Sequence, residues 1–139
     1  MKAPMFTLPT IDEESSYSLS DDLGKIVILT FWASWCPDTA RDLPKKEQFH
    51  QSADSDMLSM VTINVPGRER SDEAELQYAN KYLSQLTLKD RGREIYDKYG
   101  CTGVPTTAII NREGDIHEVF GDKASMMEIV QSVGQLLAR

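Results

Sequence analysis

The stretch KIVILTFWASWCPDTARDLP, residues 25–44, constrains the fold most, because an apolar run leads directly into a cysteine followed by a proline. Its first part is short, β-branched and aromatic, which is typical of a strand buried on both faces. Pro37 suits the first position of a helix, where its missing N–H costs no hydrogen bond and its φ is already helical. We therefore predict a buried strand followed by a helix that ends near residue 51 and is bent at Pro44.

The rest of the chain alternates strands with helices and ends in a hairpin and a helix. The segment 1–19 suits an edge hairpin at the N-terminus. Further strands are expected at 57–65 and near 85–88, helices at 71–83 and near 92–99, and two strands joined by a turn within 106–120. This order indicates an α/β fold in which helices flank a central mixed sheet, with parallel strands early and antiparallel strands late.

The last helix is expected over residues 123–137. Its apolar stripe predicts which side chains face the core. The stripe consists of Met126, Ile129, Val130, Val133 and Leu137.

Length and composition limit the possible functions. The 139 residues suit a single domain, 1–139, and the net charge of −7 argues against nucleic acid as a partner. Two cysteines and two isolated histidines are too few for a disulfide scaffold or a metal site, so we expect neither metal nor cofactor. No apolar run could span a bilayer and no signal region opens the chain, so we expect a cytoplasmic monomer. Removal of an export or anchor segment would instead indicate an extracytoplasmic protein.

Cys36 is the candidate nucleophile. If Pro37 begins the helix, the sulfur of Cys36 lies beside unpaired N–H groups and the positive end of the helix dipole, which favour the reactive thiolate. The negative charge of Asp38 opposes that effect. Trp35 offers an apolar shelf for a substrate. The alternative is that Cys36 is an ordinary buried cysteine, as most free cysteines are.

Several motifs together resemble the thioredoxin superfamily, and most closely its TlpA/ResA-like thiol-disulfide oxidoreductases. They are the opening APMFTLPTIDEESSYSLSDDLGKIVILTFWASWC, Pro44 eight positions after Cys36, and the segment YGCTGVPTTAIINREGDI. The resemblance implies a thioredoxin-like fold with an N-terminal β extension. It also implies that the Val104–Pro105 bond is cis and packed across from Cys36, and that the backbone at Val104 pairs with an extended substrate. The alternative is an ordinary trans proline at the start of a strand.

Thr39 departs from the family pattern, because it stands where a second cysteine would resolve the mixed disulfide. Residues 36 and 39 share a face of the first helical turn, so we expect the Thr39 hydroxyl to donate a hydrogen bond to the Cys36 thiolate. A hydroxyl cannot attack a disulfide. The resemblance thus implies that Cys36 and Thr39 are catalytic and that Trp35, Pro37, Val104 and Pro105 bind substrate. If Thr39 replaces a natural cysteine, the natural activity is the ordinary dithiol reaction.

Three other positions bear on this interpretation. Thr30 stands where thioredoxins carry a buried acid that serves the resolving cysteine. The absence of that acid agrees with the presence of Thr39, because a site without a resolving cysteine does not need it. Glu69 lies in a charged loop after the next strand, and we interpret it as a solvated charge. Cys101 lies four residues before Pro105, but we interpret it as a small core residue and not as a partner of Cys36.

Three functions remain open at this stage. The first is a thiol-disulfide oxidoreductase that acts through Cys36 alone and forms mixed disulfides with protein disulfides or thiols, or with a low-mass thiol. The second is a one-cysteine peroxidase, although Ala33 stands where peroxiredoxins have a threonine. The third is a redox-inactive module that binds clients in the groove around Trp35 and Pro105, since a fold does not by itself establish an activity.

Overall fold

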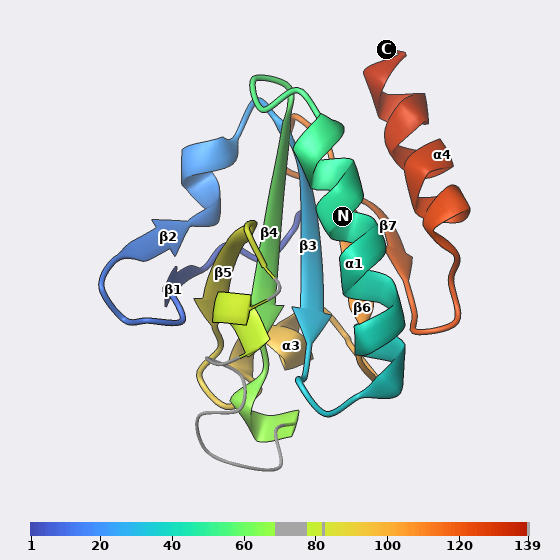
Figure 1. The fold of residues 1–139 in the computed structure, drawn as a ribbon. Coiled ribbons are helices and arrows are strands. Elements are labelled where there is room, and N and C mark those ends of the chain that lie inside the picture. Colours follow the sequence, from blue (N-terminus) through green and yellow to red (C-terminus); the bar gives the residue numbers. More distant parts are fainter. Residues whose placement is uncertain (69–77, 82, 139) are drawn as a thin grey trace.

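The computed structural model describes residues 1–68, 78–81 and 83–138, and its centre is a five-stranded sheet with helices on both faces (Figure 1). The strands are β1 (Thr7–Pro9), β2 (Ser16–Ser18), β3 (Ile26–Trp32), β4 (Leu58–Asn64), β5 (Leu86–Lys89), β6 (Thr106–Ile110) and β7 (Ile116–Phe120). The helices are α1 (Pro37–Ser52), α3 (Glu94–Lys98) and α4 (Met126–Leu137), with short 3₁₀ turns at η1 (Leu19–Asp22) and η2 (Pro66–Arg68).

The central sheet has the strand order β5-β4-β3-β6-β7. β3 pairs in parallel with β4, and β4 in parallel with β5, whereas β6 is antiparallel to both β3 and β7. The expected mixed sheet, parallel early and antiparallel late, is therefore confirmed. β1 and β2 form a separate antiparallel pair, which is the expected N-terminal β extension.

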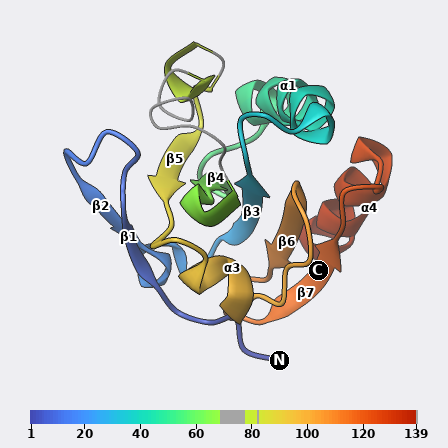
Figure 2. The same cartoon turned by 90° about the horizontal axis from the view of Figure 1, so that it is seen from below.

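The two faces of the sheet have different covers (Figure 2). α1 and α4 lie over one face, and α3 with the β1–β2 pair lies over the other. Successive side chains of a strand point to opposite faces, so Val27, Leu29 and Phe31 join the cluster that includes α3 and the N-terminal residues, whereas Ile26 and Ile28 join the cluster under α4. All seven residues of β3 are buried, as the apolar run predicts.

The last helix begins three residues later than expected and turns a slightly different face to the sheet. Ser125 caps α4 by accepting a hydrogen bond from the N–H of Glu128. Its buried residues are Ile129, Ser132, Val133 and Leu136. Leu137, placed in the core by the sequence pattern, is 40% exposed. The pattern failed there because neighbouring leucines at 136 and 137 fit a 3.6-residue period almost equally well.

The helix that follows Cys36 begins at the expected residue. α1 begins at Pro37 and continues through Pro44 to Ser52. The helix expected at 71–83 lies largely outside the described residues, of which 78–81 are helical. None of the helices in the described part of the chain is long and apolar enough to cross a membrane.

Candidate active site

Cys36 lies in the connection between the central strand, β3, and helix α1. β3 ends at Trp32, and Cys36 is the N-cap of α1, with extended backbone angles (φ −74°, ψ 123°). Its backbone N–H donates to the carbonyl of Ala33 at 3.3 Å, which closes the turn. The residue is 7% exposed, so the sulfur lies just below the surface at the carboxyl end of β3.

Val104 and Pro105 face this cysteine from the opposite side of the site. The Val104–Pro105 peptide bond is cis. The Cys36 thiol donates a hydrogen bond to the carbonyl oxygen of Val104, with Sγ and O 3.4 Å apart. β6 begins at the next residue, Thr106, and pairs with β3. The sheet therefore brings together two segments that lie 68 residues apart in the sequence.

Two local effects on the thiol oppose one another. The N-terminus of α1 favours a thiolate at Cys36, because the free N–H groups of the first turn carry partial positive charge. The carbonyl of Val104 instead favours the protonated thiol, because only the thiol can donate to it. Asp38, which the sequence places as a negative charge beside the sulfur, is ion-paired with Arg41 one turn further on. That pairing reduces the opposition expected from Asp38.

Thr39 lies in the first turn of α1 and is fully buried. Among the described residues, its hydroxyl has no hydrogen-bond partner. The expected bond from Thr39 to Cys36 is thus not formed while the thiol donates to Val104. A buried hydroxyl left unpaired is unfavourable by about 1–3 kcal/mol, so an acceptor that came within its reach would be stabilised.

The two tryptophans of the stretch differ in exposure. Trp32 is fully buried and packs with Leu43 beneath α1. Trp35 is half-buried, packs against the large core cluster, and donates its indole N–H to the carbonyl of Arg68. Part of the Trp35 side chain, which we expected to contact substrate, is therefore in contact with the protein itself.

A row of buried threonines crosses the sheet under α1. In register order it runs from Thr87 on β5 through Thr62 on β4 and Thr30 on β3 to Thr107 on β6. Thr62 and Thr87 share a hydrogen bond of 3.0 Å between their hydroxyls, whereas the Thr30 hydroxyl has no partner among the described residues. The threonine row is a polar layer that includes Thr30, the position at which thioredoxins carry a buried acid.

The ionisable group in this layer is a lysine, which the sequence pattern did not single out. Lys46 is fully buried, and its ammonium donates to Thr107 Oγ1 and to Asp42 Oδ2, each at 2.5 Å. Burial lowers the pKa of Lys46, and the Asp42 carboxylate offsets part of that effect. The signal was present in the sequence, because Lys46 follows Thr39 and Leu43 at helical spacing on the buried face of α1.

Glu47 fixes the other flank of α1. Its carboxylate accepts hydrogen bonds from the backbone and side chains of Ser84 and Gln85, at 2.6–3.2 Å. Burial alone raises the pKa of Glu47, but these four bonds to the charged form outweigh it and the pKa is lowered. Lys46 and Glu47 therefore tie α1 to β6 on one side and to the segment before β5 on the other.

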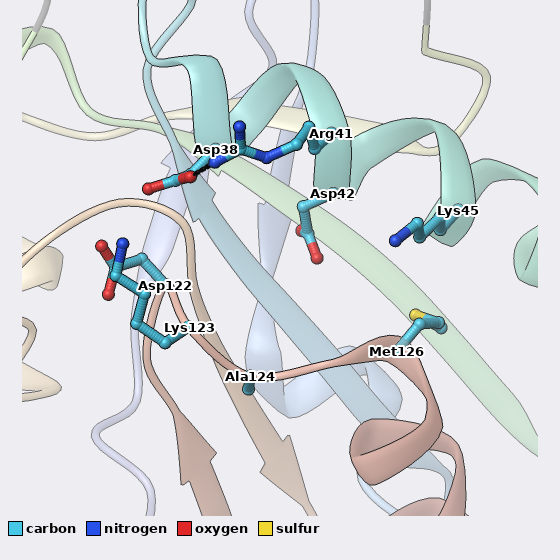
Figure 3. Close-up of a pocket in the computed structure, with 8 residues that line it drawn as sticks. All are labelled: Asp38, Arg41, Asp42, Lys45, Asp122, Lys123, Ala124 and Met126. Atoms are coloured by element: carbon cyan, nitrogen blue, oxygen red, sulfur yellow. Dashed lines mark hydrogen bonds and ion pairs between the residues drawn. The ribbon is translucent and has the colours of Figure 1, made fainter.

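A pocket opens beside the first turns of α1 (Figure 3). It lies between the helix and the connection from β7 to α4 and is lined by Asp38, Arg41, Asp42, Lys45, Asp122, Lys123, Ala124 and Met126. One of its lining residues, Asp38, lies in the first turn of α1, whose N-cap is Cys36.

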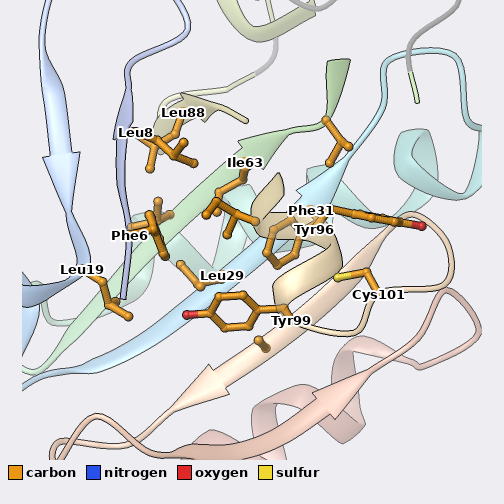
Figure 4. Packing of buried hydrophobic residues seen from close by; sticks show 14 of the residues in the cluster. Phe6, Leu8, Leu19, Leu29, Phe31, Ile63, Leu88, Tyr96, Tyr99 and Cys101 are labelled. Carbon is orange, nitrogen blue, oxygen red and sulfur yellow. The ribbon is translucent and has the colours of Figure 1, made fainter. Parts of the chain in front are cut away.

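Cys101 is part of the large core cluster, packed with Phe31, Tyr96 and Tyr99 (Figure 4). It is 8% exposed, and burial raises the pKa of its thiol to about 12. Both cysteines are free in the structure. The interpretation of Cys101 as a small core residue agrees with this placement.

Two sequence expectations concern other positions. Glu69 lies outside the described residues. No group of His, Cys, Asp and Glu residues in the described ranges could hold a metal ion.

With this geometry established, comparison with known proteins identifies the family. The sequence model of the AhpC/TSA family matches residues 1–119. The chain belongs to the AhpC/TSA family.

Its similar relatives in this family are thiol-disulfide oxidoreductases and thioredoxin-like proteins. The chain is 30% identical over 132 residues to thioredoxin-like protein YneN of Bacillus subtilis, covering 95% of this chain and 76% of that one. It is 30% identical over 116 residues to sporulation thiol-disulfide oxidoreductase A of the same organism, covering 82% and 68%. These matches place this AhpC/TSA member among the ResA-like redoxins.

Solved structures confirm the thioredoxin-like fold. The exposed lipoprotein thioredoxin Etrx1 of Streptococcus pneumoniae superposes with a TM-score of 0.83 at 29% identity, covering 96% of this chain and all of that one. DsbF of Mycobacterium tuberculosis gives 0.80 at 25% identity, covering 94% of each chain. The comparisons support a thiol-disulfide oxidoreductase family for this AhpC/TSA protein.

Proposed function

We propose that the protein is a thiol-disulfide oxidoreductase that reacts through Cys36 alone and forms mixed disulfides with protein or low-mass thiol substrates. The observation that carries the proposal is the position of Cys36, at the start of α1 and hydrogen-bonded to the carbonyl beside Pro105, with Thr39 buried where a second thiol would be. Cys101 supplies no substitute, because its raised pKa keeps it protonated at neutral pH.

The reaction begins when the Cys36 thiol loses its proton to solvent. The hydrogen bond to Val104 is then lost, and the freed carbonyl can accept an N–H from an extended substrate segment lying along Trp35, Pro37 and Pro105. The Cys36 thiolate attacks one sulfur of the substrate disulfide, a new S–S bond forms, and the other sulfur leaves as a thiolate. Thr39 cannot attack that mixed disulfide. An external thiol must therefore release Cys36.

A second candidate function is a client-binding module in which the groove is retained and Cys36 is not used. The observation that favours it is the low exposure of Cys36 together with the hydrogen bond that its thiol donates to Val104. We rank it second, because a cysteine at a helix N-terminus is in a setting that stabilises the reactive thiolate once the proton is lost.

The location and assembly are also proposals. An extracytoplasmic site of action is favoured over the cytoplasmic one expected from the sequence, because the relative Etrx1 is an exposed lipoprotein. We propose that residues 1–139 act as one domain and as a monomer.

The test measures how Cys36 turns over. The protein is mixed with a peptide disulfide, with and without a small thiol, and the adducts are followed by mass spectrometry. We expect one peptide joined to Cys36, stable until the small thiol is added, and no adduct on the Cys36→Ser variant. Rapid turnover driven by a thioredoxin reductase system alone would refute the monothiol mechanism, and an unreactive Cys36 would support the binding module.

A further inference from the structure

The pocket beside α1 has a size that suits a small charged group. Its volume is about 240 Å³, below the roughly 300–1,000 Å³ of pockets for drug-sized ligands. One wall is formed by the first turns of α1 and the other by the residues that follow β7 (Figure 3). The eight residues that line it include three acids and three bases.

Three of these charges are already engaged within the protein. Arg41 pairs with Asp38 on the surface of the helix. Asp42 Oδ2 accepts a hydrogen bond from the buried ammonium of Lys46, and the side chain of Asp42 is 14% exposed. Asp42 is thus a fixed carboxylate at the inner end of the pocket, held from behind by a group that solvent does not reach.

The other three charges are uncommitted. Among the described residues, neither an ion pair nor a hydrogen bond is formed by the side chains of Lys45, Asp122 or Lys123. Lys45 projects from α1, and Asp122 and Lys123 project from the opposite wall (Figure 3). The pocket therefore offers two ammonium groups and one carboxylate, from two elements, to a ligand with charges of both signs.

We propose that this pocket holds the charged groups of an amino-acid-like low-mass thiol, one with an ammonium group and carboxylates, while the sulfur of that thiol is joined to Cys36. The inference rests on the proposed monothiol function and names its substrate class. Asp38 lines the pocket and lies in the first turn of α1, whose N-cap is Cys36, so the proposal requires that one small molecule reach both the pocket and the thiol. An uncharged thiol forms no ion pair with these side chains, and a purely anionic thiol is repelled by the carboxylates of Asp42 and Asp122.

The chemistry balances with the low-mass thiol as the only co-reactant. The substrate is a protein cysteine capped by the low-mass thiol. The Cys36 thiolate attacks the sulfur of the cap, the protein thiolate leaves and takes up a proton, and the cap remains on Cys36. A second molecule of the low-mass thiol, as thiolate, attacks the cap sulfur and forms the low-mass disulfide, and Cys36 leaves as a thiolate.

The test compares two caps on the same peptide, glutathione and 2-mercaptoethanol. The quantity measured is the ratio of the rate constants with which Cys36 takes up each cap, followed by quenched-flow mass spectrometry. In the Lys45→Gln/Lys123→Gln variant we expect the ratio to fall roughly fivefold, because each exposed ion pair contributes modestly. Added salt lowers the ratio of the unmodified protein toward that of the variant.

Lys98→Gln is a control for the loss of an exposed positive charge away from the pocket, since Lys98 lies on α3 on the other face of the sheet. We expect its ratio to equal that of the unmodified protein. A ratio that the double variant leaves unchanged overturns the pocket assignment while the monothiol function stands. Failure of Cys36 to take up either cap overturns the monothiol function itself.

Discussion

The Cys36 thiol donates its hydrogen bond to the carbonyl oxygen of Val104, 3.4 Å away, and not to a group of its own helix. The same carbonyl is the one that the family resemblance assigns to substrate pairing. The sulfur and the substrate backbone therefore compete for one group. Ionisation of the thiol and docking of an extended segment are expected to favour each other.

Alkylation should distinguish the two cysteines. Both are nearly buried, but the pKa of Cys101 is raised to about 12, so almost none of it is thiolate near neutral pH. We expect iodoacetamide to modify Cys36 first, as read by peptide mass spectrometry, and the Cys36→Ser variant to remain unlabelled over the same time. In guanidinium, the unfolded original protein should be labelled at Cys36 and at Cys101, and the unfolded Cys36→Ser variant should be labelled at Cys101. Earlier labelling of Cys101 in the folded protein would contradict the assignment.

Thr39→Cys should restore a dithiol site. Position 39 is buried in the first turn of α1, on the same face as Cys36. We expect the variant to form an intramolecular disulfide, seen as loss of two titratable thiols, and to turn over with a dithiol reductant without an added monothiol. Thr39→Ser keeps the hydroxyl and serves as the control, with no such gain. An absence of the internal disulfide in Thr39→Cys would argue that the two positions do not meet.

Lys46→Met should change how stability depends on pH. The folded pKa of Lys46 lies below its ordinary value of 10.5. Between those two values the unfolded chain binds more protons than the folded one, so this lysine makes the native state more stable as pH rises toward 10.5. A pKa one unit lower corresponds to about 1.4 kcal/mol.

Urea unfolding from about pH 7 to about pH 10 measures this effect as the difference between the original protein and Lys46→Met. We expect the original protein to gain on the variant as pH rises. The buried tyrosines and Cys101 titrate in both proteins and cancel in the difference. Lys45→Met, an exposed neighbour, should show no such trend. A flat difference for Lys46→Met would mean that Lys46 is not held as described.

Glu47→Gln should weaken the attachment of α1. An amide can accept fewer of the four hydrogen bonds from Ser84 and Gln85 and adds its own donors, so we expect a loss of about 1–3 kcal/mol in the free energy of unfolding. The pKa of Glu47 is lowered from 4.5, so its contribution is present above that value and is lost as pH falls through the folded pKa. The difference between the two proteins should shrink in acid. Gln48→Ala, on the exposed side, is the comparison.

Peroxide should oxidise Cys36 only at the rate of an ordinary thiol. Ala33, buried in the turn before the cysteine, supplies no hydroxyl where the family resemblance calls for a threonine in peroxidases. Stopped-flow measurement of thiol loss tests this directly. A rate far above that of a free cysteine would restore the peroxidase hypothesis.

The sequence predicted the strand and the helix around Cys36 because buried strands and proline-led helices have strong local patterns. It also predicted a mixed sheet with parallel strands early and antiparallel strands late, since crossovers and a hairpin limit the pairing. It missed Lys46, because lysine on a helix is normally a surface residue and only its partners at Asp42 and Thr107 permit burial. The Thr39 hydroxyl has no partner among the described residues, and a bond from it to the Cys36 thiolate stays a prediction, because the thiol here is a donor to Val104.

Lys46 and Glu47, adjacent on α1, anchor that helix to opposite flanks of the sheet. The start of α1, and with it Cys36, is therefore held from two directions by a pair of adjacent side chains. Exposed side chains around the groove could then be varied to recruit new clients while Cys36 keeps its place. A chain of this kind is a practical starting point for engineering redox specificity.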